Sequence, residues 1–242
     1  MMFPALLFFA LLPPTLSSST FNVSRTLGSH AVLQRAPASP PIFGLAPPGT
    51  AVNVTFLGAT LSTTAGSDGS WRVFLPPTPA TTKGVPIGIS SPLGSVLLED
   101  ILFGEVFLCS GQSNLAFSLA ANTNGTQEAA GGNSYPHIRL LTVGTGTSSE
   151  TPLTDLGSLL QPWSVASNTS LINGTAVTGE FTFFSSVCYF FGRSVHDGLG
   201  GGIPVGLISS AWGVSVFAFF LLILLQLQCG RRSTPSAHPT FT

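Results

Sequence analysis

Charged side chains are scarce in this sequence. Asp, Glu, Lys and Arg make up only 7% of its 242 residues, whereas about a quarter is usual in soluble domains. The formal net charge is −1, so the chain has no basic face for a polyanion, and this composition argues against a nucleic acid partner. Hydrophobic residues make up 44% of the chain, which is enough for the core of one large domain or two small ones.

Cysteine is also rare. The three cysteines, Cys109, Cys188 and Cys229, permit at most one internal bridge, so disulfides are not expected to be the framework of the fold. Cys109 and Cys188 both lie in strongly apolar stretches, where a buried free thiol that packs as a small hydrophobic group is expected.

The start of the chain lacks basic side chains but has a short apolar run. Residues 3–12 are followed by Pro13, Pro14 and several serines. This pattern predicts a secretory signal peptide over residues 1–18, since the run is too short to cross a bilayer. The alternative is a buried N-terminal helix or strand. Five N-x-S/T sequons fit export and glycosylation, and they begin at Asn22, Asn53, Asn124, Asn168 and Asn173.

Residues 19–98 alternate short β-like runs with Gly and Pro. Residues 52–56 alternate apolar with polar side chains, as a half-buried strand does, and residues 71–75 repeat the pattern after Asp68-Gly69-Ser70. We therefore expect a small antiparallel β-domain here.

A second pattern starts at residue 99. An apolar run over residues 101–109 predicts a buried strand, residues 184–195 have apolar side chains at helical spacing on one face before Gly198, and residues 203–208 return as a strand. Strand, helix and strand in this order predict parallel α/β packing over residues 99–213. The polar residues 122–133 and 145–175 are expected to be surface loops.

Residues 214–242 differ from the rest. The apolar stretch at residues 211–227 is close to the lower limit of a transmembrane helix and is followed by Arg231 and Arg232, as in a stop-transfer segment. Membrane association through residues 211–227 and association through exposed apolar surface are both open at this point.

Ser113 is the candidate nucleophile. It lies in Ser110-Gly111-Gln112-Ser113-Asn114, directly after the predicted strand, and the carboxyl end of a strand is where α/β proteins place their chemistry. A catalytic serine needs a rigid turn, backbone N–H donors for an oxyanion and a base. Gly111 allows close approach of the backbone and Asn114 adds an amide donor. The alternative is a polar turn that caps the following helix.

Several blocks in fixed order resemble the sialate O-acetylesterase family of SGNH-type serine hydrolases. The resemblance covers roughly residues 25–213, and the blocks are residues 32–35, 41–44, 68–71, 102–114, 135–140, 187–193 and 203–208. The fold that it implies is an incomplete SGNH-type parallel α/β domain preceded by a small antiparallel β-domain.

The resemblance implies a secreted or lysosomal esterase that removes O-acetyl groups from sialic acids without a metal or organic cofactor. Ser113 matches the family's nucleophile, and the N–H groups of Ser113 and Gly213 are the expected oxyanion donors, with Asn114 as a further site residue. After Gly213 the match stops, where the family continues with a second glycine.

The expected base is missing. In the family it is a histidine three positions after an aspartate, and no Asp in this chain has His at that spacing. His30, His137, His196 and His238 are expected to be structural or solvated. We therefore predict a truncated family member with little esterase activity. A non-catalytic glycan-binding or membrane-displayed protein is the alternative.

Overall fold

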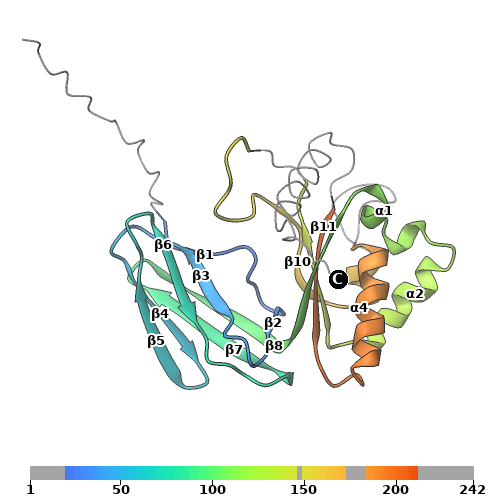
Figure 1. Cartoon of the computed structure of the whole chain (residues 1–242), viewed down its shortest axis with the longest axis horizontal. Helices are drawn as coiled ribbons and strands as arrows, with labels where there is room; N and C mark the ends of the chain where they lie inside the picture. Colours follow the sequence, from blue (N-terminus) through green and yellow to red (C-terminus); the bar gives the residue numbers. More distant parts are fainter. Residues whose placement is uncertain (1–19, 146–148, 173–183, 212–242) are drawn as a thin grey trace, which may run out of the picture.

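The computed structural model describes residues 20–145, 149–172 and 184–211. Figure 1 shows these residues as two parts that lie side by side: a β-rich part, coloured blue to green, and a part that combines strands with helices, coloured green to red. One long strand runs through both parts. The sequence patterns therefore predicted the fold class correctly, a mixed α/β sheet with a separate antiparallel sheet.

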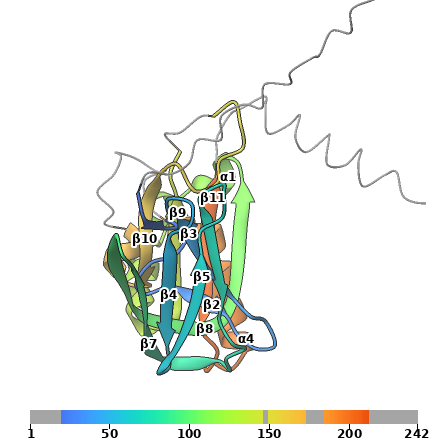
Figure 2. The ribbon, with the colours of Figure 1, turned by 90° about the vertical axis from the view of Figure 1, so that its left-hand side faces the viewer.

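The β-rich part contains eight strands in two sheets. A three-stranded antiparallel sheet has the order β1-β3-β6, and the larger sheet contributes β5, β4, β7 and β8, with β2 parallel to β8. Figure 2 shows these strands from their outer side, with α4 behind them. The strands are β1 (Asn22–Val23), β2 (Val32–Gln34), β3 (Pro41–Leu45), β4 (Ala51–Phe56), β5 (Ala59–Thr64), β6 (Ser70–Phe74), β7 (Thr81–Ser91) and β8 (Gly94–Gly111).

Period-two patterning explains these strands. Exposed and buried residues alternate without exception along β4 and β6, so one face of each strand packs inward. The inward residues form one core, in which Ile42, Val52 and Val54 are fully buried and Trp71 is 2% exposed. The two strands that were predicted from alternation are confirmed.

Strand β8 continues from the antiparallel sheet into the parallel one. Its first half pairs with β7, and residues 105–111 pair in parallel with β11 (Val205–Ala211). Strand β11 also pairs in parallel with β9 (Ile138–Val143), and β10 (Leu159–Val165) closes this edge antiparallel to β9. The parallel packing that was predicted after residue 99 is confirmed. The predicted domain boundary between residues 98 and 99 falls inside β8, and the division itself stays a prediction.

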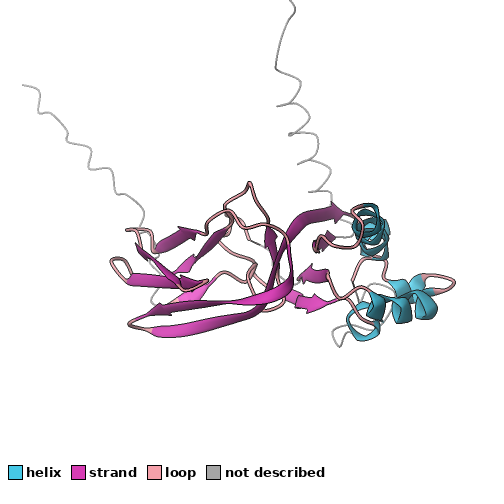
Figure 3. Cartoon of the chain, turned by 90° about the horizontal axis from the view of Figure 1, so that it is seen from below, coloured by secondary structure: helices cyan, strands magenta, loops and turns pink. Residues whose placement is uncertain are grey.

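Short helices cover one end of the molecule (Figure 3). They are α1 (Ser113–Ala116), α2 (Gly125–Gly131), α3 (Asn168–Ile172) and α4 (Ser186–Gly198), with 3-10 turns at Leu119–Ala121 and Gly132–Ser134. Residues 122–133 and 145–175 were expected to be loops, and this was wrong in part, because α2, β10 and α3 lie within them. These elements pack into a second core, which includes Leu119, Leu171 and Phe184. Each element has too few apolar residues to show a helix or strand period in the sequence.

Helix α4 was predicted correctly, and its expected apolar face was right only in part. Cys188 is fully buried, whereas Val187 is 54% exposed and Phe191 is 45% exposed. The helix comes close to β11 at Gly192, where a Cβ would lie 2.3 Å from a Leu207 methyl carbon, and Tyr189 is fully buried as well. The buried face therefore includes residues outside the apolar pattern, and hydrophobicity alone does not reveal this.

Cys109 and Cys188 form a disulfide that joins β8 to α4. The expectation of two buried free thiols was therefore wrong. The two cysteines are 79 residues apart in sequence, and their Cα atoms lie 5.9 Å apart. Apolar surroundings were evidence of burial, but they carried no information on which two buried residues meet.

No helix in the part of the chain that the structure describes is long and apolar enough to cross a membrane. The candidate segment at residues 212–227 lies outside the described residues, as do the predicted signal peptide and Cys229.

Candidate active site

Ser113 stands on a turn at the carboxyl end of β8. The expectation of a buried strand over residues 101–109 was right only in part, because residues 101–104 are buried whereas Leu108 is 67% exposed. Strand β8 ends at Gly111, and α1 begins at Ser113. The carbonyl oxygen of Gln112 accepts the N–H groups of Leu115 and Ala116, which closes the turn. Ser113 and Asn114 are both exposed. Among the described residues, no hydrogen bond to the Ser113 hydroxyl is present, so this hydroxyl is open to a substrate.

Backbone donors are available at the same turn. The first N–H groups of a helix have no acceptor within that helix, and Ser113 and Asn114 are the first two residues of α1. These donors can stabilise negative charge that develops on an oxygen beside the serine. The turn therefore supplies a hydroxyl and an oxyanion-type environment together. The catalytic roles expected for Ser113 and Asn114 stay predictions.

The neighbouring strand brings a second segment to the turn. Ser210 and Ala211 of β11 lie in register with Ser110 and Gly111 of β8. Gly213, the other expected oxyanion donor, follows two residues later and lies outside the described residues. Its role therefore stays a prediction.

The turn is braced against α4. The disulfide of Cys109 lies four residues before Ser113, and the N–H of Ser186 donates to the carbonyl oxygen of Phe117 at 2.8 Å, directly after α1. Ser185 caps α4 by accepting the N–H of Cys188. A rigid support of this kind keeps a nucleophile in one orientation.

A shallow hollow of about 400 Å³ opens beside the turn. Asn114, Phe117 and Val187 contribute to its wall, together with Ala121, Asn122 and Ser186. Ser113 does not line the hollow itself, but its neighbour Asn114 does. The hollow therefore offers a place for the part of a substrate that leads away from the reacting ester.

The described histidines lie far from Ser113. His137 precedes β9, whose first residue is in register, through Val205, with Glu105 of β8. Glu105 is six residues from Gly111 at the end of β8, which corresponds to about 20 Å of strand, and Ser113 follows two residues later. The ring of His196 is 6.3 Å from that of His137, so it lies at the same distant edge. His238 is outside the described residues.

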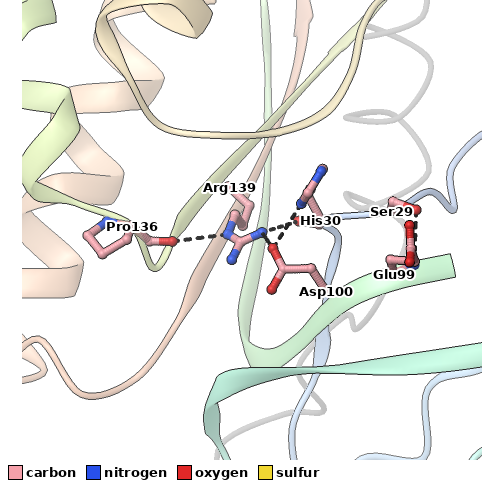
Figure 4. A network of polar contacts seen from close by, with 6 residues as sticks. All are labelled: Ser29, His30, Glu99, Asp100, Pro136 and Arg139. Atoms are coloured by element: carbon pink, nitrogen blue, oxygen red, sulfur yellow. Dashed lines mark hydrogen bonds and ion pairs between the residues drawn. The ribbon is translucent and has the colours of Figure 1, made fainter.

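His30 belongs to a different cluster, where β8 passes from one sheet to the other. Figure 4 shows its ring against Asp100 and the Arg139 guanidinium, with Nδ1 of His30 2.8 Å from Oδ2 of Asp100. Arg139 donates to the same oxygen at 2.6 Å and to the carbonyl oxygen of Pro136 at 3.1 Å. None of the three described histidines lies at the Ser113 turn, and their structural or solvated role stays a prediction.

Asp100 is held as a carboxylate in this cluster. Partial burial acts to raise its pKa, but hydrogen bonds from Arg139 and His30 outweigh it and bring the pKa below the ordinary value of 3.8. The Arg139 side chain is only 6% exposed, so Asp100 neutralises a buried cation. Sequence reasoning missed this pair, although Arg139 lies in one of the recognised blocks.

No cluster of three or more His, Cys, Asp or Glu that could hold a metal occurs within residues 20–145, 149–172 and 184–211.

The fold and the serine turn together define an acetylesterase-type α/β architecture. The crystal structure of a carbohydrate acetylesterase from Xanthomonas citri superposes with a TM-score of 0.69 at 28% identity, covering 81% of this chain and 41% of that one. No family model matches the sequence.

Relatives with similar sequences identify the family within this class of acetylesterases. The sialate O-acetylesterases of Pongo abelii and Homo sapiens are each 32% identical over 206 residues, and that of Mus musculus is 31% identical over 205. The alignments cover 80% of this chain. The chain belongs to the sialate O-acetylesterase family. It spans 37% of the length of the first two of these relatives.

Proposed function

We propose that this chain carries the nucleophile of an ester hydrolase that removes O-acetyl groups from sialic acids or related acetylated glycans. The observation that carries the proposal is the exposed Ser113 hydroxyl at the first residue of α1, just beyond the carboxyl end of the parallel strand β8. The relatives are sialate O-acetylesterases, and the similar crystal structure is a carbohydrate acetylesterase.

In this proposal the Ser113 oxygen attacks the acetyl carbonyl carbon. The carbonyl oxygen becomes an oxyanion, which the N–H groups at the start of α1 stabilise, and the sugar oxygen leaves as the alcohol when it receives a proton. Water then releases acetate from the serine. A base must take the proton of the Ser113 hydroxyl during its attack and, later, a proton of the attacking water. Such general-base assistance increases the rate on the order of a hundred- to ten-thousand-fold.

None of the described histidines lies near Ser113, so the 242-residue chain alone is expected to hydrolyse an aryl acetate or an O-acetylated sialic acid at a near-background rate. The Ser113→Ala variant should give the same rate. A robust rate that disappears with Ser113→Ala would contradict this expectation, since another residue of the chain would then act as the base.

A chimera tests the nucleophile directly. Residues 20–211 replace the matching segment of a curated relative, which then supplies whatever this segment lacks. We expect ester hydrolysis that Ser113→Ala abolishes and that Ser110→Ala, at the end of the same strand, leaves within a few-fold of the parent chimera. A folded but inactive chimera, or one that Ser113→Ala leaves active, would show that Ser113 is not the nucleophile.

A glycan-binding protein without catalysis is the second candidate. It is favoured by the roughly 20 Å of strand between the end of β8 next to Ser113 and the edge that carries His137. A folded chimera that binds acetylated glycans without hydrolysing them would support it.

We also propose that the chain enters the secretory pathway, because an apolar run with small residues opens it and five sequons follow. Four of these sequons have their Asn within the described residues, and Asn22, Asn53 and Asn124 are exposed. Peptide mass spectrometry of the secreted product should show loss of residues 1–18 and glycans on these asparagines. An intact Met1 would contradict the signal peptide. Retention in the membrane fraction after carbonate extraction would favour membrane association through residues 211–227.

A further inference from the structure

A pocket of about 430 Å³ lies on the β-rich part, away from the Ser113 turn. Its floor is the outer face of the three-stranded sheet, where Phe43 and Leu45 of β3 stand opposite Arg72 and Ser70 of β6. Its volume falls in the range that small-molecule sites occupy.

The rim of the pocket comes from the segment between β9 and β10. Thr154 and Asp155 belong to this segment and face Ser24, which directly follows β1. The Asp155 carboxylate accepts the Ser24 hydroxyl at 2.7 Å and the N–H groups of Arg25 and Leu156. These bonds join two segments that are about 130 residues apart, so the pocket is formed before any ligand binds.

The Asp155 carboxylate is satisfied by these donors, whereas the Arg72 guanidinium is not. Arg72 lies over the Phe43 ring, with its central carbon 5.8 Å from the ring centroid. In the part of the chain that the structure describes, the guanidinium of Arg72 has no ion pair and no hydrogen bond. Its five N–H donors are therefore open to a ligand, and their planar arrangement fits a carboxylate with two parallel hydrogen bonds.

The remaining walls suit a sugar ring. The Phe43 ring and the Leu45 side chain are apolar, and the hydroxyls of Ser70 and Thr154 are hydrogen-bonding groups. A pyranose has apolar C–H faces and a rim of hydroxyls, so it can contact both. A small inorganic anion would use Arg72 alone and leave the apolar walls uncovered.

We infer that this pocket binds a sugar residue that carries a carboxylate, with the carboxylate on Arg72 and one face of the ring against Phe43. The inference does not depend on the esterase proposal, because binding is measured directly and in a chain that carries Ser113→Ala.

The experiment is a ligand-observed NMR titration of the 242-residue chain with matched pairs of probes. Each pair differs only at the carboxylate: methyl glucuronide against methyl glucoside, methyl galacturonide against methyl galactoside, and a methyl sialoside against its carboxyl methyl ester. At least one acid should bind about tenfold more tightly than its neutral partner, as expected for a charged hydrogen bond.

Two variants assign that preference to the pocket. Arg72→Gln should remove the difference between acid and neutral sugar, and Phe43→Ala should weaken both by roughly fivefold. Phe74→Ala is the matched control, because Phe74 is 59% exposed on β6 and does not line the pocket. Circular dichroism confirms that each variant is folded.

Three results would overturn the inference. They are equal affinity for every acid and its neutral partner, an acid preference that survives Arg72→Gln, and sulfate binding as tight as that of the preferred acid. Absence of binding by all acids at roughly 10 mM would overturn it as well.

Discussion

The β-rich part and the helix-containing part differ in how they bury their apolar side chains. In the first, the inner sheet faces close on one core, and the exposed large apolar side chains are scattered: Leu57 and Leu93 lie at turns, Phe74 on β6 and Leu97 on β8. In the second, Val187 and Phe191 lie one turn apart on α4, and both are about half exposed although the Phe191 ring packs edge-on against Phe107. The exposed apolar side chains of the β-rich part are therefore isolated, whereas those of α4 form a stripe.

The core of the β-rich part is expected to be the most sensitive place in the molecule. Trp71→Ala should lower the free energy of unfolding by about 3–5 kcal/mol, because a buried ring that stacks on Phe21 is replaced by a cavity. Urea unfolding followed by circular dichroism measures the loss. Phe74→Ala on the same strand is the control and should stay within about 0.5 kcal/mol. Similar losses for the two variants would contradict the closed core.

The helix-containing part depends on a covalent link. Replacing Cys109 and Cys188 together by Ala should cost about 2–4 kcal/mol, since the unfolded chain gains the freedom of the opened loop. The measurement is urea unfolding with and without dithiothreitol. Reductant should destabilise the parent chain and leave the double variant unchanged. Alkylation of both thiols in the native, unreduced protein would show that the bridge is absent.

The polar cluster between the two parts should have a smaller effect. Asp100→Asn leaves the buried Arg139 without its carboxylate, and because Asp100 is more than a third exposed, we expect a loss of only about 1–2 kcal/mol. The folded-state pKa is lowered, so the carboxylate stabilises the fold above pH 3.8 and loses this effect as the pH falls below that value.

Urea unfolding at pH 7 and at pH 3 tests this assignment. The difference between Asp100→Asn and the parent chain should shrink at the lower pH. Asp68→Asn, at an exposed turn, is the control without a charged partner. A difference for Asp100→Asn that grows on acidification would contradict the assignment.

The stripe on α4 should have the smallest effect on stability per residue. Val187→Ser with Phe191→Ser should lower the free energy of unfolding by only about 0.5–1 kcal/mol per site, because both side chains are about half exposed already. The same pair should reduce self-association in sedimentation experiments. If the double variant unfolds at much lower urea concentration, the stripe is buried in solution, and the two parts do not differ in how they bury their apolar side chains.

Sequence reasoning worked where a local pattern determines the structure. Alternation along β4 and the apolar run of β8 were sufficient, because side-chain direction in a strand has a fixed period. The position of Ser113 at the sheet edge was predicted for a related reason, since a polar turn after a strand lies there; its role as the nucleophile stays a prediction.

Features that depend on contacts between distant segments were missed. The Cys109–Cys188 bridge and the Asp100–Arg139 pair join residues 79 and 39 positions apart. The close approach of α4 to the sheet at Gly192 involves Leu207, which lies against it. The pocket around Arg72 likewise needs the rim that Asp155 holds in place. No periodic pattern of apolar residues in the sequence predicts these contacts.

The pairing of β8 has a consequence for synthesis on the ribosome. The half of β8 that pairs with β7 can fold as soon as it emerges, because β7 precedes it. The other half pairs with β11, in which each residue follows its partner by 100 positions. At typical elongation rates this delay is roughly 5–20 s. During that time residues 105–111 expose an unpaired, largely apolar strand edge, so the nascent chain should need a chaperone at this stage.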